Sequence, residues 1–132
     1  MHAVRTSLSM LGNLKQHPLY KTIQAAPQAY REVPFSLKTQ GRTLHGVIDL
    51  LYQDAQDSWH VLDWKTEWTP EEKVAERAQE HRVQMAVYAL AVERQLGVIP
   101  GVELCFLSPR VRLVEVEKRM IQEGGELLFN TK

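Results

Sequence analysis

Gly46-Val47-Ile48-Asp49 and Val61-Leu62-Asp63-Trp64-Lys65-Thr66 are two short apolar runs that also carry charged residues. Asp63 and Lys65 are two positions apart, so on a strand their side chains project from the same face. Ionised groups beside apolar runs are costly unless a partner or a metal offsets them. Two carboxylates that converge with one ammonium suit a divalent cation and an anionic substrate. The pattern therefore predicts a metal-dependent phosphodiester hydrolase.

The chain has the size and composition of one soluble globular domain. Its 132 residues can bury a core, and 44% hydrophobic with 24% charged residues is ordinary for that class. The 16 basic and 16 acidic residues give no net charge, which counts mildly against tight, independent DNA binding. The sequence has neither an apolar run long enough to span a membrane nor a signal segment, so a cytoplasmic protein is expected.

Periodicity and turn residues predict the order helix, three strands, long helix, two strands. Helical spacing covers residues 4–16, and residues 19–26 add one or two helical turns after His17-Pro18. Pro34 marks the first strand as an edge strand or a bulge. Strands are expected over residues 29–37, 43–52, 59–65, 101–107 and 111–117. The expected fold is α/β: a three-strand meander, a crossover helix and two further strands in a mixed sheet flanked by helices.

The long helix has a marked start and end. Thr69, Pro70 and Glu72 predict a capping box with proline at the first helical position, and Gly97 predicts a stop after about Leu96. An apolar stripe on this helix is expected in the core: Val74, Ala78, Met85, Ala89, Val92 and Leu96. The sequence from Arg119 onward favours no single secondary structure, and Gly124-Gly125 is expected to break any helix there.

The charged residues of the two opening runs each have an ordinary explanation when taken singly. Asp49 could face solvent on an edge strand, because acids are rarely buried unpaired. Asp63 and Lys65 could form a surface ion pair, which contributes little to stability. Taken together they indicate a site, because the hairpin between their strands lets all three side chains reach one point.

The chemistry expected of such a site follows from its residue types. The two carboxylates offer hard oxygen ligands for Mg²⁺ or Mn²⁺, and the main-chain carbonyl of Trp64 is a further candidate ligand. The metal would polarise a phosphate and lower the pKa of a bound water. Lys65 is placed to orient the attacking water or to neutralise charge that develops on the phosphate oxygens.

Four motifs in order resemble the PD-(D/E)xK nuclease superfamily, in particular the nuclease domain of RecB- and AddA-type helicase–nucleases. The resemblance covers roughly residues 10–120. It rests on Arg31-Glu32-Val33-Pro34-Phe35, Gly46-Val47-Ile48-Asp49, Asp63-Trp64-Lys65-Thr66 and Gln84-Met85-Ala86-Val87-Tyr88. It implies a DNA substrate, Mg²⁺ or Mn²⁺ as cofactor, and a partner that is a helicase domain or a separate helicase chain.

The resemblance also implies a role for each matching position. Asp49 and Asp63 would be metal ligands and Lys65 the catalytic lysine. Glu32 would join the catalytic group in a supporting or substrate-positioning role. Gln84 and Tyr88 are four residues apart and share a helix face. In the family this pair lines the pocket and contacts DNA or braces the lysine; the alternative is a polar helix face in solvent.

The chain departs from the family at its histidines and cysteines. RecB- and AddA-type domains carry a metal-binding histidine upstream of the Glu–x–Pro–Phe strand, and the only candidates here, His2 and His17, lack the expected context. Cys105 is the single cysteine and is expected in the core, so no iron–sulfur cluster is expected. We therefore expect one nuclease domain over residues 1–132, shortened at its N-terminus, as a fragment or a standalone protein.

The leading functional hypothesis is a metal-dependent DNA nuclease, with exonuclease-type processing of DNA ends in recombination or repair. One rival is a catalytically weak or inactive nuclease-like module that binds DNA or docks a helicase. The intact Asp–Asp–Lys set argues against this rival, and the absent histidine and neutral net charge argue for it. A second rival is an interaction domain with accidental motifs, against which four motifs in register argue.

Overall fold

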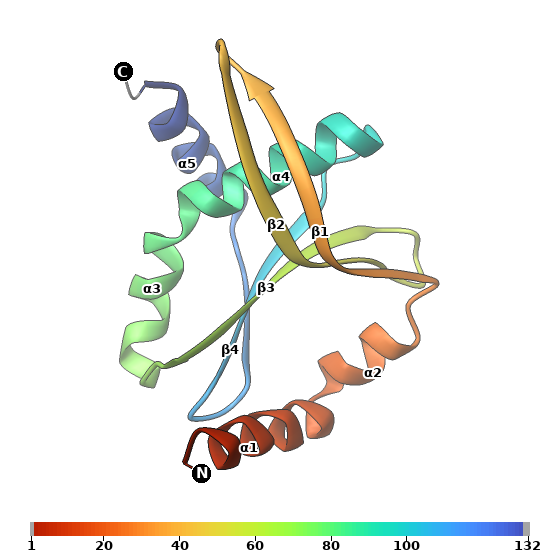
Figure 1. Cartoon of the computed structure of the whole chain (residues 1–132), viewed down its shortest axis with the longest axis vertical. Coiled ribbons are helices and arrows are strands. Elements are labelled where there is room, and N and C mark those ends of the chain that lie inside the picture. Colours follow the sequence, from red (N-terminus) through yellow and green to blue (C-terminus); the bar gives the residue numbers. More distant parts are fainter. Residues whose placement is uncertain (1, 131–132) are drawn as a thin grey trace.

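A computed structural model describes residues 2–130, which form three layers around a central sheet (Figure 1). One face carries α1 (His2–Gln16) and α2 (Pro18–Gln24). The other carries the short 3-10 helix η1 (Glu71–Lys73), α3 (Val74–Glu80), α4 (Arg82–Leu96) and α5 (Lys118–Asn130). The strands are β1 (Gln28–Thr39), β2 (Arg42–Gln53), β3 (Trp59–Trp68), β4 (Gly101–Ser108) and β5 (Arg112–Glu115). The expected α/β class is confirmed.

The five strands lie in the order β1-β2-β3-β4-β5, so neighbours in sequence are neighbours in the sheet. β1, β2 and β3 form an antiparallel meander, β4 joins β3 in parallel, and β5 returns antiparallel to β4. The parallel pair requires a crossover, which α3 and α4 supply. Pro34 lies in β1, an edge strand, as its missing N–H donor predicts.

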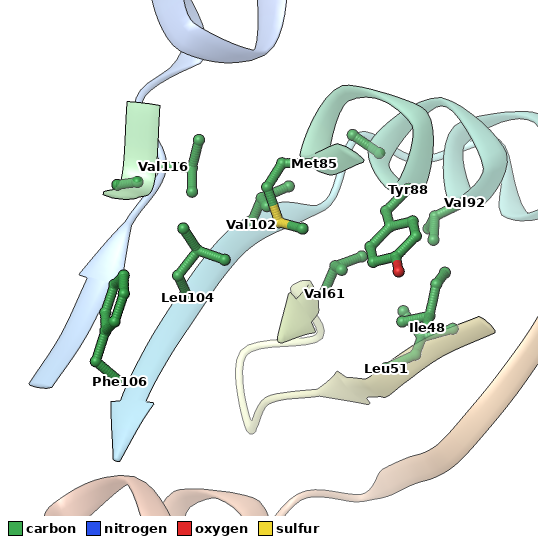
Figure 2. Close-up of a cluster of buried hydrophobic side chains, with 12 residues drawn as sticks. Ile48, Leu51, Val61, Met85, Tyr88, Val92, Val102, Leu104, Phe106 and Val116 are labelled. Atoms are coloured by element: carbon green, nitrogen blue, oxygen red, sulfur yellow. The ribbon is translucent and has the colours of Figure 1, made fainter. Parts of the chain in front are cut away.

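The sheet buries apolar side chains on both faces. Towards α4, strand residues such as Ile48, Val61 and Leu104 meet Met85 and Val92 (Figure 2). Towards α1 and α2, Leu19 packs with Leu50, Tyr52, Leu62 and Cys105. Each large aliphatic side chain that is fully buried stabilises the fold by about 1.5–3 kcal/mol. Cys105 is fully buried, which confirms its expected place in the core.

The predicted long helix is three pieces, and its predicted cap is wrong. The Thr69 hydroxyl donates to the carbonyl of Glu67 at 3.1 Å, and the Thr69 amide donates to the carbonyl of Ser108 at 2.9 Å. Thr69 therefore closes the end of β3 onto β4, and no side chain caps η1. The helix then bends at His81 (φ −93°, ψ 7°) between α3 and α4. Leu96 is 42% exposed, which corrects its predicted place in the core stripe.

The C-terminal tail forms α5, which runs without a break through the two glycines that were expected to interrupt it. A Cβ atom at Gly124 would come within 2.3 Å of the carbonyl oxygen of Arg82, so glycine permits close contact between α5 and the first turn of α4. That packing offsets the helix propensity cost of glycine, about 1 kcal/mol per residue.

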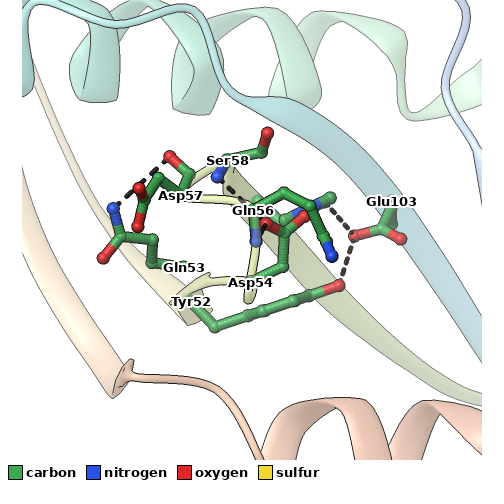
Figure 3. Close-up of polar contacts among 8 residues, drawn as sticks. Tyr52, Gln53, Asp54, Gln56, Asp57, Ser58 and Glu103 are labelled. Atoms are coloured by element: carbon green, nitrogen blue, oxygen red, sulfur yellow. Dashed lines mark hydrogen bonds and ion pairs between the residues drawn. The ribbon is translucent and has the colours of Figure 1, made fainter.

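A polar cluster fastens the β2–β3 hairpin to β4 (Figure 3). The Tyr52 hydroxyl donates to Glu103 Oε1 at 2.9 Å, and His60 Nδ1 lies 3.1 Å from the same oxygen. His60 Nε2 lies 2.7 Å from Asp54 Oδ2, at the start of the hairpin loop. Burial raises the pKa of Glu103, and these partners work against that shift. The cluster holds the register of the hairpin at the end of the sheet where β4 begins.

Candidate active site

The site lies where β2 separates from β3. Their ladder ends at the pair Leu50–Leu62, and β2 continues beside β1 alone while β3 continues beside β4. Figure 1 shows β1 and β2 turning away from β3 and β4 together. Asp49 and Asp63 are the first residues past the last pair, one on each diverging strand. The gap gives both carboxylates a position inside the sheet where the flank facing the other strand has no ladder partner, while Asp63 still pairs with Leu104 of β4 on its other flank.

Asp49 is held in this gap by the backbone of the neighbouring strand. Its Oδ2 accepts a hydrogen bond of 2.8 Å from the Trp64 amide. The amide faces the space that β2 has left, so the carboxylate replaces the missing ladder acceptor. Trp64 therefore contributes its N–H to the site. The proposed use of its carbonyl as a ligand stays a prediction.

Asp63 and Lys65 share a face of β3, as their spacing predicts, and form a short ion pair. Lys65 Nζ lies 2.6 Å from Asp63 Oδ2, and their side chains are only 12% and 5% exposed. The pKa of Asp63 is raised to about 6, chiefly by burial; Lys65 opposes this rise, and the nearby Asp49 carboxylate adds to it. The structure thus brings Asp49, Asp63 and Lys65 together.

A chain of hydrogen bonds connects Lys65 to α4. Lys65 Nζ donates to Gln84 Oε1 at 3.3 Å, and Gln84 Nε2 donates to the Tyr88 hydroxyl at 3.0 Å. Burial raises the pKa of Tyr88, and the Asp63 carboxylate raises it as well. Gln84 itself is exposed. The arrangement lets Gln84 brace the lysine, one of the two roles that the resemblance implies.

Tyr88 is also a core residue, in contrast to the polar helix face in solvent that was the alternative for this pair. It is 7% exposed, and the edge of its ring meets Phe35 at 5.5 Å between ring centroids. Phe35 in turn lies across from Gly46, where a Cβ atom would come within 2.6 Å of the ring. Phe35 and Gly46 had no role assigned from the sequence; the signal that could have found them was a glycine within a strand opposite an aromatic residue.

Glu32 lies level with Asp49 in strained backbone. Arg31 pairs with Leu50 and Val33 with Ile48, while Glu32 between them has φ +50°. Such a backbone costs a residue with a side chain on the order of 1–3 kcal/mol and is concentrated at functional sites. Glu32, Asp49 and Trp64 line part of a cavity of about 1060 Å³ beneath α1 and α2. Glu32 is therefore beside the acidic pair, as the resemblance implies.

Replacing Glu32 by glycine is expected to stabilise the protein while lowering cleavage. Glycine relieves the positive φ, which we expect to raise the free energy of unfolding by about 0.5–1 kcal/mol. Gln40→Gly is the matched control, because Gln40 has φ +49° in the distant β1–β2 turn. Thermal melting should rise for both variants, and cleavage of linear DNA should fall only for Glu32→Gly. Equal cleavage by the two variants would assign Glu32 a structural role alone.

The upstream histidines do not join the site among the described residues. His17 begins α2, and its Nδ1 accepts a hydrogen bond of 3.1 Å from the Leu19 amide. His17 therefore serves as the N-cap of α2. The side chain of His2, the other candidate, lies outside the described residues.

Two carboxylates are the acidic groups that the site offers to a metal. Within the part of the chain that the structure describes, no group of three or more His, Cys, Asp or Glu side chains is placed to hold a cation. Mg²⁺ is commonly bound through one or two carboxylates while it keeps several waters. Asp49 and Asp63 fit that pattern, and a cation would oppose the burial and the smaller Asp49 repulsion that raise the pKa of Asp63.

The fold and the site together define a nuclease-type domain: two acids and a lysine on diverging strands, braced by a helix. The sequence model of the PD-(D/E)XK nuclease superfamily matches residues 8–129. The chain therefore belongs to this superfamily, and the resemblance drawn from its four motifs is confirmed. In the described residues, no helix is long and apolar enough to cross a membrane.

Known relatives agree with this membership. The chain is 32% identical over 93 residues to an ATP-dependent helicase/nuclease subunit from Carboxydothermus hydrogenoformans, covering 61% of this chain and 8% of the relative. It is 33% identical over 102 residues to the protein of the same name from Desulfitobacterium hafniense, covering 70% of this chain and 7% of the relative. The chain thus spans less than a tenth of either relative.

A solved structure supports the fold. The crystal structure of a candidate exonuclease from Eubacterium rectale superposes with a TM-score of 0.67 at 12% identity, covering 96% of this chain and 50% of that one. At this identity the likeness concerns the fold alone.

Proposed function

We propose that this chain hydrolyses DNA phosphodiesters with Mg²⁺ or Mn²⁺ bound by Asp49 and Asp63. The observation that carries the proposal is the Asp63–Lys65 pair at 2.6 Å, beside Asp49 in the gap between β2 and β3. Membership of a nuclease superfamily supports hydrolysis. The name helicase/nuclease, which the relatives carry, supports DNA as the substrate.

Each residue of the site has a distinct task in this proposal. When bound, the metal would polarise the phosphate and lower the pKa of a water. Lys65 neutralises charge on the phosphate oxygens, where it acts on the transition state more than on the bound substrate. Gln84 and Tyr88 hold the lysine, and the Trp64 amide holds Asp49. These positions are set by rigid strands and a helix, so little reorganisation is needed when substrate arrives.

We further propose that the cut is exonuclease-type processing of DNA ends in recombination or repair, in the cytoplasm. A helicase domain or a separate helicase chain would deliver the DNA, since the relatives are helicase/nuclease proteins of which this chain spans 7–8%. The chain itself has no net charge. A neutral domain makes few phosphate contacts of its own, so a partner that holds the DNA would supply the missing affinity.

The proposal is tested by cleavage of linear duplex and single-stranded DNA by the purified chain. We expect weak cleavage, detectable with Mn²⁺ at low salt and lost as salt rises above about 0.1 M, because few phosphate contacts hold the DNA. Cleavage should stop in EDTA. Undiminished cleavage in EDTA would contradict metal dependence, and robust cleavage at physiological salt would contradict the need for a partner.

The second candidate function is a nuclease-like module that binds DNA or docks a helicase without cutting. The observation that favours it is the small acidic set: among the described residues, no third acid or histidine is placed to hold a cation together with Asp49 and Asp63. This candidate predicts DNA or helicase binding that is unaffected by loss of Asp63. The buried ion pair of Asp63 and Lys65 argues for catalysis, because a module without chemistry gains little from a raised carboxylate pKa.

Replacing Gln84 by alanine is expected to lower cleavage at least tenfold and to shift the melting temperature by only about one or two degrees. Gln84 is exposed, so its loss removes the brace on Lys65 and little packing. Tyr88→Phe is the companion variant, since it removes the hydroxyl that accepts from Gln84 and keeps the ring against Phe35. Melting curves measure the effect on stability, and single-turnover cleavage measures the effect on the chemical step. A large stability loss with normal cleavage would show that this position is structural.

A further inference from the structure

The cavity beneath α1 and α2 meets the candidate active site from the face of the sheet opposite α4. Its volume is about 1060 Å³, and Asp49 and Glu32 line one part of it. Most of its other lining is apolar, including Leu14 of α1 and Ile23 of α2. Pockets of this size bury small organic ligands, and a few polar groups beside an apolar wall fix their orientation. The cavity therefore suits a ligand with flat apolar surfaces and a charged part near the proposed metal site.

Two aromatic rings line this cavity, those of Trp64 and Tyr20. Trp64 lies between Asp63 and Lys65 on β3, so its side chain points to the opposite face of the strand, towards α1 and α2. Both rings are half-buried and keep part of their surface free. The Trp64 amide also holds Asp49, at 2.8 Å, which fixes the indole beside this carboxylate. Such a ring is a surface on which an unpaired nucleobase stacks, whichever base it is.

Arg31 brings a positive charge to the cavity. Neighbouring residues of a regular strand face opposite ways, yet Arg31 and Glu32 both line the cavity. The positive φ of Glu32, +50°, breaks the alternation of β1 and brings the two side chains to one side. Arg31 is exposed, and among the described residues no ion pair or side-chain hydrogen bond engages its guanidinium. A free guanidinium is suited to bind a phosphate through two parallel N–H groups.

The dimensions of the cavity admit a single strand and exclude a duplex. Its volume equals that of a cube about 10 Å on a side, whereas the major groove alone of duplex DNA is about 12 Å wide. α1 and α2 cover the cavity on the side away from the sheet (Figure 1). Two polar side chains of α2 line it as well: Gln24 Nε2 donates to the Tyr20 hydroxyl at 3.0 Å. The Gln24 carbonyl oxygen and the Tyr20 O–H are then left for the edge of a base.

We propose that the cavity is a subsite for unpaired nucleotides of a DNA strand, in which a base packs on the Trp64 indole and Arg31 contacts the backbone phosphate. This rests on the proposed nuclease function, which names DNA as the substrate and Asp49 as a metal ligand. The two faces of the sheet then have separate tasks: Lys65 acts on the reacting phosphate from the side of α4, and the cavity holds the strand on the side of α1. Because a paired base enters only at the cost of unpairing and unstacking, the site selects single strands.

The first test makes Trp64 the only tryptophan of the full chain. Trp59→Phe keeps a ring beside Tyr30, and Trp68→Phe changes a side chain of a residue that is 71% exposed. In EDTA at low salt, a thymidine strand of about eight nucleotides should quench the Trp64 fluorescence as a base stacks on the indole. An abasic strand of equal length and charge should leave the fluorescence unchanged and bind about tenfold more weakly, as loss of base stacking predicts. A blunt, GC-rich duplex should also leave the fluorescence unchanged.

The second test removes the positive charge of Arg31. Affinity is measured from the anisotropy of a labelled thymidine strand, in EDTA, with the native tryptophans in place. Arg31→Gln should weaken binding about tenfold, the size expected for a hydrogen bond to a charged group. Arg119→Gln is the matched control, because Arg119 is exposed on α5, across the sheet from the cavity, and its loss changes the net charge equally. This control should bind the strand as wild type does.

Three results would each overturn the proposal: equal losses in the two arginine variants, equal affinity for the thymidine and abasic strands, or Trp64 fluorescence that stays constant when the thymidine strand binds. Cleavage of linear DNA with Mn²⁺ tests the nuclease function separately. Cleavage by a chain that binds the thymidine and abasic strands equally rejects the subsite alone. Binding as expected without any cleavage rejects the nuclease function alone.

Discussion

Replacing Asp63 by asparagine is expected to abolish metal-dependent cleavage and to stabilise the metal-free protein. The carboxylate is buried beside Asp49, and its pKa is raised to about 6 in the fold. A carboxyl group whose pKa is higher in the folded than in the unfolded state disfavours the fold once it is ionised. At pH 7.5 the gain from its removal is on the order of 1–3 kcal/mol, which we expect to raise the melting temperature by a few degrees.

The pH dependence of this gain gives a second readout. The difference in stability between Asp63→Asn and wild type should shrink as the pH falls below about 6, because the wild-type carboxyl then becomes protonated. Asp57→Asn is the control: Asp57 is exposed, and asparagine tolerates its φ of +66°. It should change neither cleavage nor stability. Cleavage at the wild-type rate by purified Asp63→Asn protein would remove Asp63 from the site.

Replacing Lys65 by alanine is expected to lower cleavage by about 10²–10³-fold while metal binding is retained, because the ammonium acts on charge that develops in the transition state. Lys65 Nζ lies 2.6 Å from Asp63 Oδ2. Loss of the lysine therefore frees this oxygen as a metal ligand. Single-turnover cleavage at saturating Mn²⁺ measures the chemical step, and a Mn²⁺ titration measures binding on the same preparation.

Lys73→Ala serves as the matched control for Lys65, since Lys73 forms an exposed pair with Glu76 on η1 and α3. It should leave both cleavage and Mn²⁺ binding unchanged. If Lys65→Ala instead lost Mn²⁺ binding together with cleavage, the lysine would be a structural support of the acidic pair. If it cleaved normally, another group would have to stabilise the phosphate.

The strands and the set of Asp49, Asp63 and Lys65 could be predicted because their signals are local. Apolar runs bounded by turn residues indicated the sheet, and the spacing of Asp63 and Lys65 indicated their shared face. The gap between β2 and β3 could not be predicted, because it depends on where two strands stop pairing. It is this gap that lets the Trp64 amide bind Asp49.

The errors have a common cause in contacts between distant segments. The residues around Thr69 in the sequence predict a helix cap, but the Thr69 amide donates a hydrogen bond to the carbonyl of Ser108 in β4. Gly124 looks like a helix breaker, but it allows α5 to approach Arg82. Tyr88 shares a helix face with polar Gln84, which does not predict a core position. The Tyr88 ring is in the core because it packs against Phe35 of β1. Propensity is a weak guide wherever packing of this kind decides.

The most direct measurement is the binding of Mn²⁺ to the metal-free chain, followed by electron paramagnetic resonance of the free ion. Wild type should bind one ion with a dissociation constant on the order of millimolar, as suits a site with few charged ligands. Asp63→Asn should lose this binding, Lys65→Ala should keep it, and Asp57→Asn should match wild type. Absence of binding by wild type, or equal binding by wild type and Asp63→Asn, would contradict a metal site at Asp49 and Asp63.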